Sequence, residues 1–310
     1  MSSRQATASA PASVGNVGVG FDILGHSIAG PVDRVTVLRT ASTEVRITAI
    51  SGVVAGLPLD AEANTAGRAL ISLQQRLGLA HGFELSIDKG IPFAAGMGGS
   101  AASCVAALVA ANAVLDQPVG VEALYPCALE GEAVASGSKH GDNVGPMLLG
   151  GLVLATRDRL VSVPVPRGLT CVLVHPDQML ETRTARAVLN RPFQLAQFVA
   201  QSANLALVLT GCYREDFDAI AAGLRDVLVE PLRAPLVPAF GEVQAAALST
   251  GALGASISGG GPSIFAWCTV QRAPHIAEAM AAAFRRNSIG CEVFISPVAG
   301  PAARVVECST

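Results

Sequence analysis

A glycine-rich run between a strand-like and a helix-like segment is the feature that most constrains the fold of this chain. Residues 91–103 read IPFAAGMGGSAAS. Glycine tolerates positive φ and lets the backbone approach a ligand closely. A helix that begins near Ser100 presents free N–H groups and the positive end of its dipole. The run therefore predicts an anion-binding loop that needs no charged side chain, although by itself it also fits a tight turn capped by Ser100.

The segments around this loop alternate between strand and helix patterns. In residues 43–50 apolar and polar side chains alternate, which predicts a half-buried strand. We expect this strand to pair with another at residues 32–39. Asn64 and Gly78 are suited to begin and end a helix. Further strands are predicted at 83–87, 152–156, 160–164, 170–174, 263–269 and 291–295, and further helices from about residue 100, at 193–210 and at 273–286.

Length and composition exclude several classes of protein. The 310 residues exceed one small core, so we expect two α+β domains that join near residues 155–165. Only two of the 21 basic residues are lysines, and no Lys/Arg run exists, so the electrostatic footprint of a nucleic-acid-binding protein is missing. The seven cysteines include no CxxC pair, which argues against a disulfide framework or a zinc site.

No segment predicts a membrane partner. The richest apolar stretch, residues 101–115, is interrupted by polar residues and is shorter than the roughly 20 residues of a spanning helix. The N-terminal residues contain no continuous apolar segment of the kind found in secretory signals. We therefore expect a cytoplasmic protein.

The glycine-rich run matches neither the Walker A pattern nor the dinucleotide-binding fingerprint. Its pattern, Pro-x-x-x-Gly-Met-Gly-x-Ser-Ala-Ala, instead resembles the phosphate loop of the GHMP kinases (galactokinase, homoserine kinase, mevalonate kinase and phosphomevalonate kinase). That family usually has two serines after the glycines, whereas this chain has Gly99 at the first position and keeps Ser100 at the second. The resemblance implies an ATP site formed by Asn64, Pro92, Ala95, Gly96, Met97, Gly98, Gly99, Ser100, Ala101 and Ala102.

Three more segments resemble the same family and occur in its order. They are APASVGNVGVGFDILG at residues 10–25, EAVASGSKHGDNVGPMLLGG at 132–151 and GASISGGGPS at 254–263. The first two resemble the forms found in homoserine kinases. Each alone also fits a turn, a solvated loop or a hairpin. Together they imply the two-domain GHMP kinase fold, with an N-terminal α+β ATP-binding domain at 1–160 and a C-terminal ferredoxin-like α+β domain at 161–310.

The resemblance also implies an activity and its residues. Homoserine kinases use ATP and Mg²⁺ to phosphorylate the hydroxyl of L-homoserine in threonine biosynthesis, and a homodimer is plausible for this family. Ser100 and Glu132 would hold Mg²⁺, an ion that prefers oxygen ligands. The residues implied around the substrate are Asn16, Asp22, His140, Arg186 and Arg233, and those implied in catalysis are Asn143, Asp22, Glu132 and Ser100.

Several questions stay open at this level. Asn143 cannot accept a proton, so the hydroxyl proton could pass to the γ-phosphate or to Asp22. Lys89 precedes the loop and fits either a phosphate contact or a solvated side chain. Two other functions remain, namely a GHMP kinase for another small alcohol and a catalytically silent sensor of ATP and a metabolite.

Overall fold

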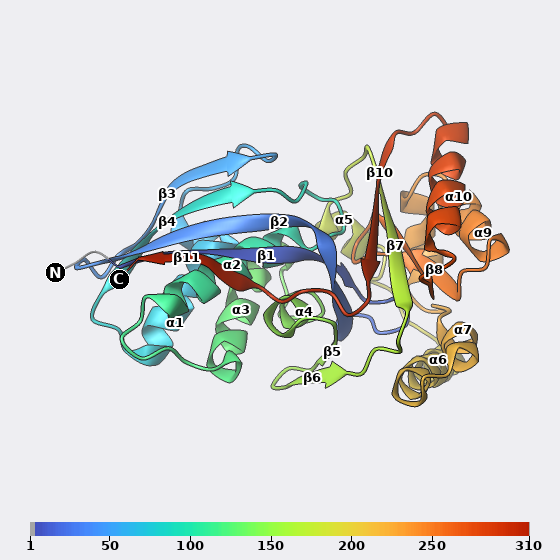
Figure 1. Cartoon of the computed structure of the whole chain (residues 1–310), viewed down its shortest axis with the longest axis horizontal. Coiled ribbons are helices and arrows are strands. Elements are labelled where there is room, and N and C mark those ends of the chain that lie inside the picture. Colours follow the sequence, from blue (N-terminus) through green and yellow to red (C-terminus); the bar gives the residue numbers. More distant parts are fainter. Residues whose placement is uncertain (1–3, 310) are drawn as a thin grey trace.

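The computed structural model describes residues 4–309, which form two β-sheets with helices packed against them (Figure 1). The first sheet has seven strands, in the order β11-β1-β2-β4-β3, with β5 paired to β2 and β6 to β5. The second sheet has four, in the order β10-β7-β9-β8. The strands are β1 (Gln5–Gly15), β2 (Leu24–Thr40), β3 (Val45–Gly52), β4 (Gly82–Lys89), β5 (Leu152–Ala155), β6 (Leu160–Val163), β7 (Leu169–Pro176), β8 (Gly254–Ile257), β9 (Ile264–Thr269), β10 (Cys291–Pro297) and β11 (Arg304–Ser309).

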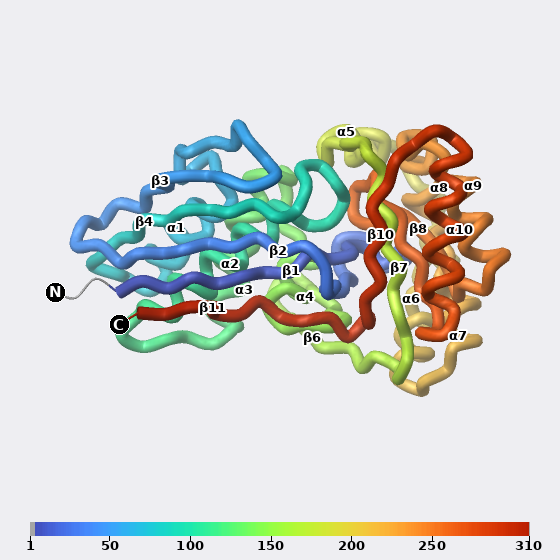
Figure 2. The backbone as a smooth tube through the Cα atoms, turned by 45° about the horizontal axis from the view of Figure 1, so that its top comes forward, coloured from blue at the N-terminus to red at the C-terminus, as the bar shows by residue number. Residues whose placement is uncertain are grey.

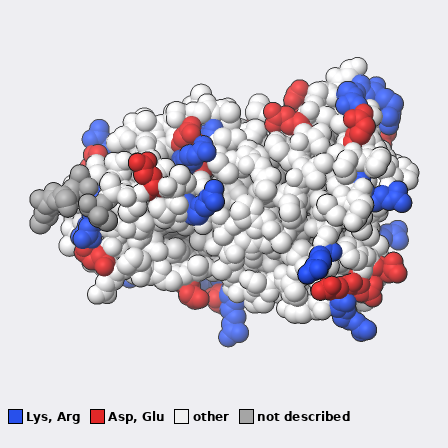
Figure 3. Space-filling view, viewed as in Figure 1, with Lys and Arg blue, Asp and Glu red and all other residues white. Residues whose placement is uncertain are grey.

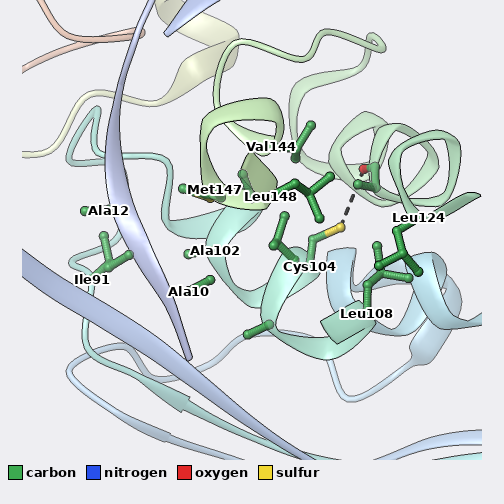
Figure 4. Close-up of a cluster of buried hydrophobic side chains, with 14 of the residues drawn as sticks. Ala10, Ala12, Ile91, Ala102, Cys104, Leu108, Leu124, Val144, Met147 and Leu148 are labelled. Carbon is green, nitrogen blue, oxygen red and sulfur yellow. Dashed lines mark hydrogen bonds between the residues drawn. The ribbon is translucent and has the colours of Figure 1, made fainter. Parts of the chain in front are cut away.

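Helices cover one face of the first sheet and bury a core of small side chains. The helix that follows the glycine-rich run, α2, packs on β1 and β2 and buries ten of its residues. Figure 4 shows Cys104 and Leu108 of this helix in one buried cluster with Leu124, Met147 and Leu148. The helices are α1 (Thr65–Leu77), α2 (Gly99–Ala113), α3 (Val121–Ser136), α4 (Val144–Leu149), α5 (Thr182–Ala187), α6 (Leu195–Arg214), α7 (Phe217–Gly223), α8 (Glu230–Arg233), α9 (Phe240–Ser249) and α10 (Ala273–Arg286), with 3-10 turns at Ala61–Ala63 and Ala234–Leu236.

The predicted pairing of residues 32–39 with 43–50 was wrong. Both segments are strands, but β4 lies between β2 and β3. β3 and β4 are parallel and are joined by α1, which is the crossover connection that parallel neighbours require. The alternation in β3 also stops early, because a bulge between Ile47 and Ala49 shifts the register and leaves Ala49 exposed.

The second sheet confirms the predicted ferredoxin-like arrangement. Its elements follow the order strand, helices, two strands, helix, strand, and its first strand, β7, lies between β10 and β9. α10 spans Ala273–Arg286, as the sequence predicts, and packs against α9, β7 and β10. The turn between β8 and β9 contains the glycines of the motif at residues 254–263. The two strands are antiparallel neighbours, so the interpretation of this segment as a hairpin is also correct.

The chain returns to the first sheet at its C-terminal end. β11 pairs with β1, so the beginning and the end of the described chain lie side by side (Figure 2). A division at residue 160 falls at the start of β6, which still belongs to the first sheet. A division by sheets would therefore assign residues 304–309 to the N-terminal part, and the domain limits stay a prediction.

Charges are sparse on the surface, and basic and acidic side chains are interspersed on the face shown in Figure 3. Within the described part of the chain, α6 is long and apolar enough to cross a membrane by length and composition. A single such helix is weak evidence for a membrane span. All seven cysteines are free.

Candidate active site

A cavity of about 480 Å³ brings the four sequence motifs together. Its wall includes the glycine-rich loop, the segment that ends β1, the start of α4 and the turn after β8. Of the predicted site residues, it is lined by Asn16, Asp22, Asn64, Pro92, Ala95, Gly96, Gly98, Gly99, Ser100, Glu132, His140, Asn143, Arg186 and Arg233. Met97, Ala101 and Ala102 do not line it, because their side chains are buried in the core behind the loop.

Two glycines give the loop its shape. Gly96 and Gly98 have φ of 72° and 70°, in the left-handed region that other residues rarely adopt. A Cβ atom at Gly96 would lie 2.5 Å from the carbonyl oxygen of Ser258, and one at Gly98 would lie 2.5 Å from Ser13 Oγ. The loop therefore packs against β1 and against the turn after β8 with no room for a side chain at either position.

The third glycine motif holds the loop from the other side. Ser258 Oγ donates a hydrogen bond to the carbonyl oxygen of Gly96 (2.6 Å), and Ser263 Oγ donates to that of Ala95 (2.6 Å). Two carbonyl groups of the loop thus point to the second sheet. The contact joins segments more than 160 residues apart and attaches the loop to both sheets.

The predicted metal ligands lie in direct contact. Ser100, in the first turn of α2, donates a hydrogen bond to the carboxylate of Glu132 in α3 (3.0 Å). Burial raises the pKa of Glu132 to about 7, and His140 and Ser100 only partly offset it. Among the described residues the carboxylate accepts no side-chain hydrogen bond other than that from Ser100. A buried carboxylate and a hydroxyl at a helix N-terminus fit Mg²⁺, whose charge would stabilise the ionised form of Glu132.

His140 is held by a carboxylate that sequence reasoning did not include among the site residues. Its Nδ1 lies 2.9 Å from Asp142 Oδ1, and the backbone N–H of Asn16 donates to the other oxygen of Asp142 (3.1 Å). Burial alone would lower the pKa of His140. The hydrogen bond and the charge of Asp142, together with Glu132 and Asp22, outweigh burial and raise this pKa to about 9. His140 is therefore a cation at neutral pH.

Asp22 and Arg186 form an ion pair across the cavity. Arg186, in α5, donates to both oxygens of Asp22, at 2.8 and 3.1 Å. The backbone N–H of Asp22 donates to Asn16 Oδ1 (2.9 Å), which fixes the turn that carries the carboxylate. Within the described chain, His140 Nε2 and Arg186 Nε are buried and have no hydrogen-bond partner. Unpaired buried donors are costly, so these atoms point to a ligand that would accept from them.

Arg233 is buried and has no carboxylate partner among the described residues. Its Nε donates to the carbonyl oxygen of Ala185 and its Nη1 to that of Gly259, both at 2.9 Å. Burial, and next the nearby Arg186, lower its pKa to about 10. Both guanidinium groups lie over the ring of Phe21, at 5.2 Å for Arg233 and 5.4 Å for Arg186. Two cations gathered around one aromatic ring make a site for an anionic group.

The two asparagines have different surroundings. Asn143 precedes α4, and its Oδ1 accepts from Ser13 Oγ (2.8 Å), while its amide nitrogen makes no hydrogen bond within the described part. Asn64 caps α1, accepting from the N–H of Ala66 (3.0 Å) and donating to the carbonyl oxygen of Pro58 (2.9 Å). Asn64 thus lies at the cavity with its side chain already used for structure.

Sequence reasoning missed several residues that shape the site. Asp142, Ser13 and Phe21 all lie inside the quoted motifs. Ser13 and Phe21 contact residues more than 120 positions away, whereas Asp142 contacts both the nearby His140 and the distant Asn16. The sequence did not indicate Asp33 as a site residue, because it lies within a segment whose pattern predicts only a strand. Among the described residues, Asp22, His140 and Asp142 also form a cluster with metal-ligand geometry. Their charges are already compensated within the cluster and by Arg186, so Ser100 and Glu132 fit Mg²⁺ better.

Comparisons with known proteins agree with this geometry. Residues 64–151 match the family model "GHMP kinases N terminal domain", and residues 208–286 match "GHMP kinases C terminal". A homoserine kinase from Xanthomonas campestris pv. campestris is 57% identical, and the match covers 98% of this chain and 94% of that protein. A homoserine kinase from Chloroherpeton thalassium is 40% identical over 98% of this chain and 100% of that protein.

Solved structures agree as well. The crystal structure of homoserine kinase from Cytophaga hutchinsonii superposes with a TM-score of 0.93, at 40% identity over 97% of each chain. The crystal structure of L. major mevalonate kinase in complex with R-mevalonate shares the fold, with a TM-score of 0.65 at 13% identity over 95% of this chain and 97% of that chain. The full-length similarity, the two family matches and the assembled motifs show that the chain belongs to the GHMP kinases, in the family of the homoserine kinases.

Proposed function

We propose that this protein transfers the γ-phosphoryl group of ATP to the hydroxyl group of L-homoserine and releases O-phospho-L-homoserine and ADP. The observation that carries the proposal is a single cavity lined both by the glycine-rich loop and by the Arg186–Asp22 and His140–Asp142 pairs. Phosphoryl transfer depends mainly on the positioning of the two reactants and on the stabilisation of charge. The cavity contains groups suited to each of these tasks.

The loop would hold the phosphates of ATP through backbone N–H groups at the N-terminus of α2. Ser100 and Glu132 would hold Mg²⁺, which supplies charge neutralisation to the phosphates when it is bound. Asn64 lies at the cavity wall near the start of α1 and supports a position for the nucleoside nearby. The contact between Ser100 and Glu132 is the support for this assignment.

A zwitterionic amino acid fits the charged groups that line the cavity beside the loop. Arg233 has no carboxylate partner among the described residues, and with Arg186 it would bind the substrate carboxylate. Asp22 and Asp142 are suited to the ammonium group. Mevalonate has no ammonium group, so this acidic pair would gain no partner from it.

The hydroxyl proton has no strong protein base nearby. His140 carries its proton at neutral pH, and both carboxylate oxygens of Asp22 already accept hydrogen bonds from Arg186. These contacts support transfer of the proton to the γ-phosphate itself. Asn143 would orient the hydroxyl, and His140 would stabilise charge on the transferred group.

The test is ADP release from MgATP by the purified protein with L-homoserine, L-threonine, L-serine, mevalonate or galactose. We expect strong stimulation by L-homoserine alone, with O-phospho-L-homoserine identified by mass spectrometry. Stimulation by another compound would overturn the specificity. ATP binding without stimulation by any of them would favour the silent sensor.

Two other expectations stay predictions. Chromatography with light scattering would test the predicted homodimer, and localisation in the cytoplasm also stays a prediction.

A further inference from the structure

A buried ion pair lies directly beneath the phosphate loop. Lys89 is the last residue of β4 and Asp33 lies in β2, and they are 4% and 0% exposed. The ammonium group of Lys89 donates to the Asp33 carboxylate, to the carbonyl oxygen of Gly99 (2.6 Å) and to Ser103 Oγ (2.9 Å). An ammonium group has three protons, so these contacts use all of them.

The carboxylate of Asp33 connects the two ends of the loop. Its Oδ1 accepts hydrogen bonds from the backbone N–H groups of Gly90 (3.0 Å) and Ile91 (3.1 Å), where the loop begins. Its Oδ2 accepts from Ser103 Oγ (2.7 Å) in α2, the helix into which the loop leads. One buried carboxylate therefore contacts the entry of the loop directly, and it contacts α2 through Ser103 and Lys89.

We propose that Asp33 and Lys89 are positioning residues for phosphoryl transfer, which set where the N-terminus of α2 lies relative to the end of β4. The pair fixes the path of the loop and thereby the direction of its N–H groups. The proposal deepens the nucleotide-binding part of the function proposed above and rests on it. It answers what Lys89 does, since neither a phosphate contact nor a solvated side chain describes it in this structure.

The competing role for Lys89 is a direct phosphate contact. Lys89 lines the cavity, so its distance from a phosphate bound there does not exclude such a contact. To contact a phosphate, however, the ammonium group would have to leave Asp33. The fully buried Asp33 carboxylate would then have no counter-ion. The two roles predict different behaviour for Asp33: essential if the pair positions the loop, dispensable if Lys89 binds phosphate.

The test compares Asp33→Asn, Lys89→Met, the double variant and Ser103→Ala. Asn keeps an acceptor for the N–H groups of Gly90 and Ile91, and Met replaces the lysine chain without its charge. The double variant leaves no unpaired buried charge, so we expect it to fold even where a single variant does not. Ser103→Ala removes one hydroxyl and is the mildest change.

We measure kcat, the affinity for MgADP by calorimetry and the thermal unfolding temperature. The double variant should lose about 10- to 100-fold in kcat, the size typical of a small misplacement of catalytic groups. The folded single variants should match it within about threefold, because the residues act as one unit. Ser103→Ala should lose severalfold in kcat.

Lys139→Met is the matched control. Lys139 is the only other lysine of the chain and forms an exposed pair with Glu130 (2.7 Å). Its kcat and its MgADP affinity should stay within about twofold of the original protein. An equal loss in this variant would mean that the effect of Lys89→Met reports a general loss of positive charge, and would overturn the proposal.

Two further results would overturn it. If the double variant and Ser103→Ala keep full kcat and only unfold at a lower temperature, the pair serves stability alone. If Lys89→Met weakens MgADP binding but not adenosine binding, while Asp33→Asn binds MgADP normally, Lys89 is a phosphate ligand. MgADP binding needs no acceptor, so this part of the test does not depend on the L-homoserine assignment, whereas the kcat measurements do.

Discussion

The carboxylate of Asp22 and the guanidinium of Arg186 lie 164 residues apart in the chain and meet through two hydrogen bonds of 2.8 and 3.1 Å. Asp22 has a φ of 63°, so its backbone adopts an uncommon conformation that the bond to Asn16 supports. The pair places an acceptor for an ammonium group beside a donor for a carboxylate. This arrangement predicts recognition of a zwitterion.

We expect Asp22→Asn to lower kcat/KM for L-homoserine by about 100-fold, since it leaves Arg186 without its partner and removes the ammonium acceptor. MgADP affinity should change less than threefold, because the hydrogen bonds of the pair, to each other and to Asn16, do not involve the loop. Parallel measurement of both quantities checks this. A comparable loss of MgADP affinity would show that Asp22 acts on the nucleotide side.

Asn143→Ala should lower kcat by about 100-fold and raise KM for L-homoserine much less, because the side chain acts on charge that develops during transfer. Steady-state kinetics separate the two effects. Ser13→Ala removes the hydrogen bond that orients Asn143 and should give an intermediate loss. Equal changes in kcat and KM would instead assign Asn143 to substrate binding.

Glu132 should make the ligand-free protein less stable as pH rises. Its pKa is about 7 in the folded protein and near the ordinary 4.5 when unfolded, so the free energy of unfolding falls between those values and stays low above them. Glu132→Gln should therefore be more stable at pH 8 by on the order of 2–3 kcal/mol and similar at pH 4.5. Denaturant unfolding at both pH values measures the difference.

The same variant tests the metal site. MgADP should stabilise the original protein at pH 8 and stabilise Glu132→Gln far less, because the amide is a poor Mg²⁺ ligand. Below pH 7, protonation of Glu132 should raise the Mg²⁺ concentration needed for binding. Equal Mg²⁺ dependence in both proteins would remove Glu132 from the metal site.

The burial of His26 predicts the opposite pH dependence, in which the free energy of unfolding falls in acid. It lies fully buried between the sheets, where Trp267 Nε1 donates to its Nε2 (3.1 Å), and burial lowers its pKa to about 4. The unfolded chain binds a proton near pH 6.5, so stability is complete above that pH and is lost as pH falls towards 4. His26→Gln should lose less stability than the original protein over this interval, by on the order of 3 kcal/mol.

Urea unfolding at pH 7 and at pH 4.5 measures that difference between the two proteins. The carboxylates of the chain titrate equally in both proteins, so their contributions to the difference in stability cancel. The prediction fails if both proteins lose stability in parallel, which would mean that His26 gains no proton on unfolding.

The amino-acid sequence by itself determined the family, the α+β class and part of the helices and strands, and most residues that it predicts for the site line the cavity. The loop before Ser100, the ends of α1 and the whole of α10 follow from local rules, because glycines, caps and helical periodicity act over a few residues. The resemblance of four ordered motifs supplied the fold and the expected roles.

Only the tertiary structure decided the contacts between distant segments. β4 lies between β2 and β3, the backbone N–H of Asn16 donates to Asp142, Asp22 holds Arg186, and Asp33 holds Lys89 beneath the loop. None of these partnerships follows from local patterns. Strand order depends on the crossover of a whole helix, and the partner of a buried charge depends on which side chains the folded core excludes from water.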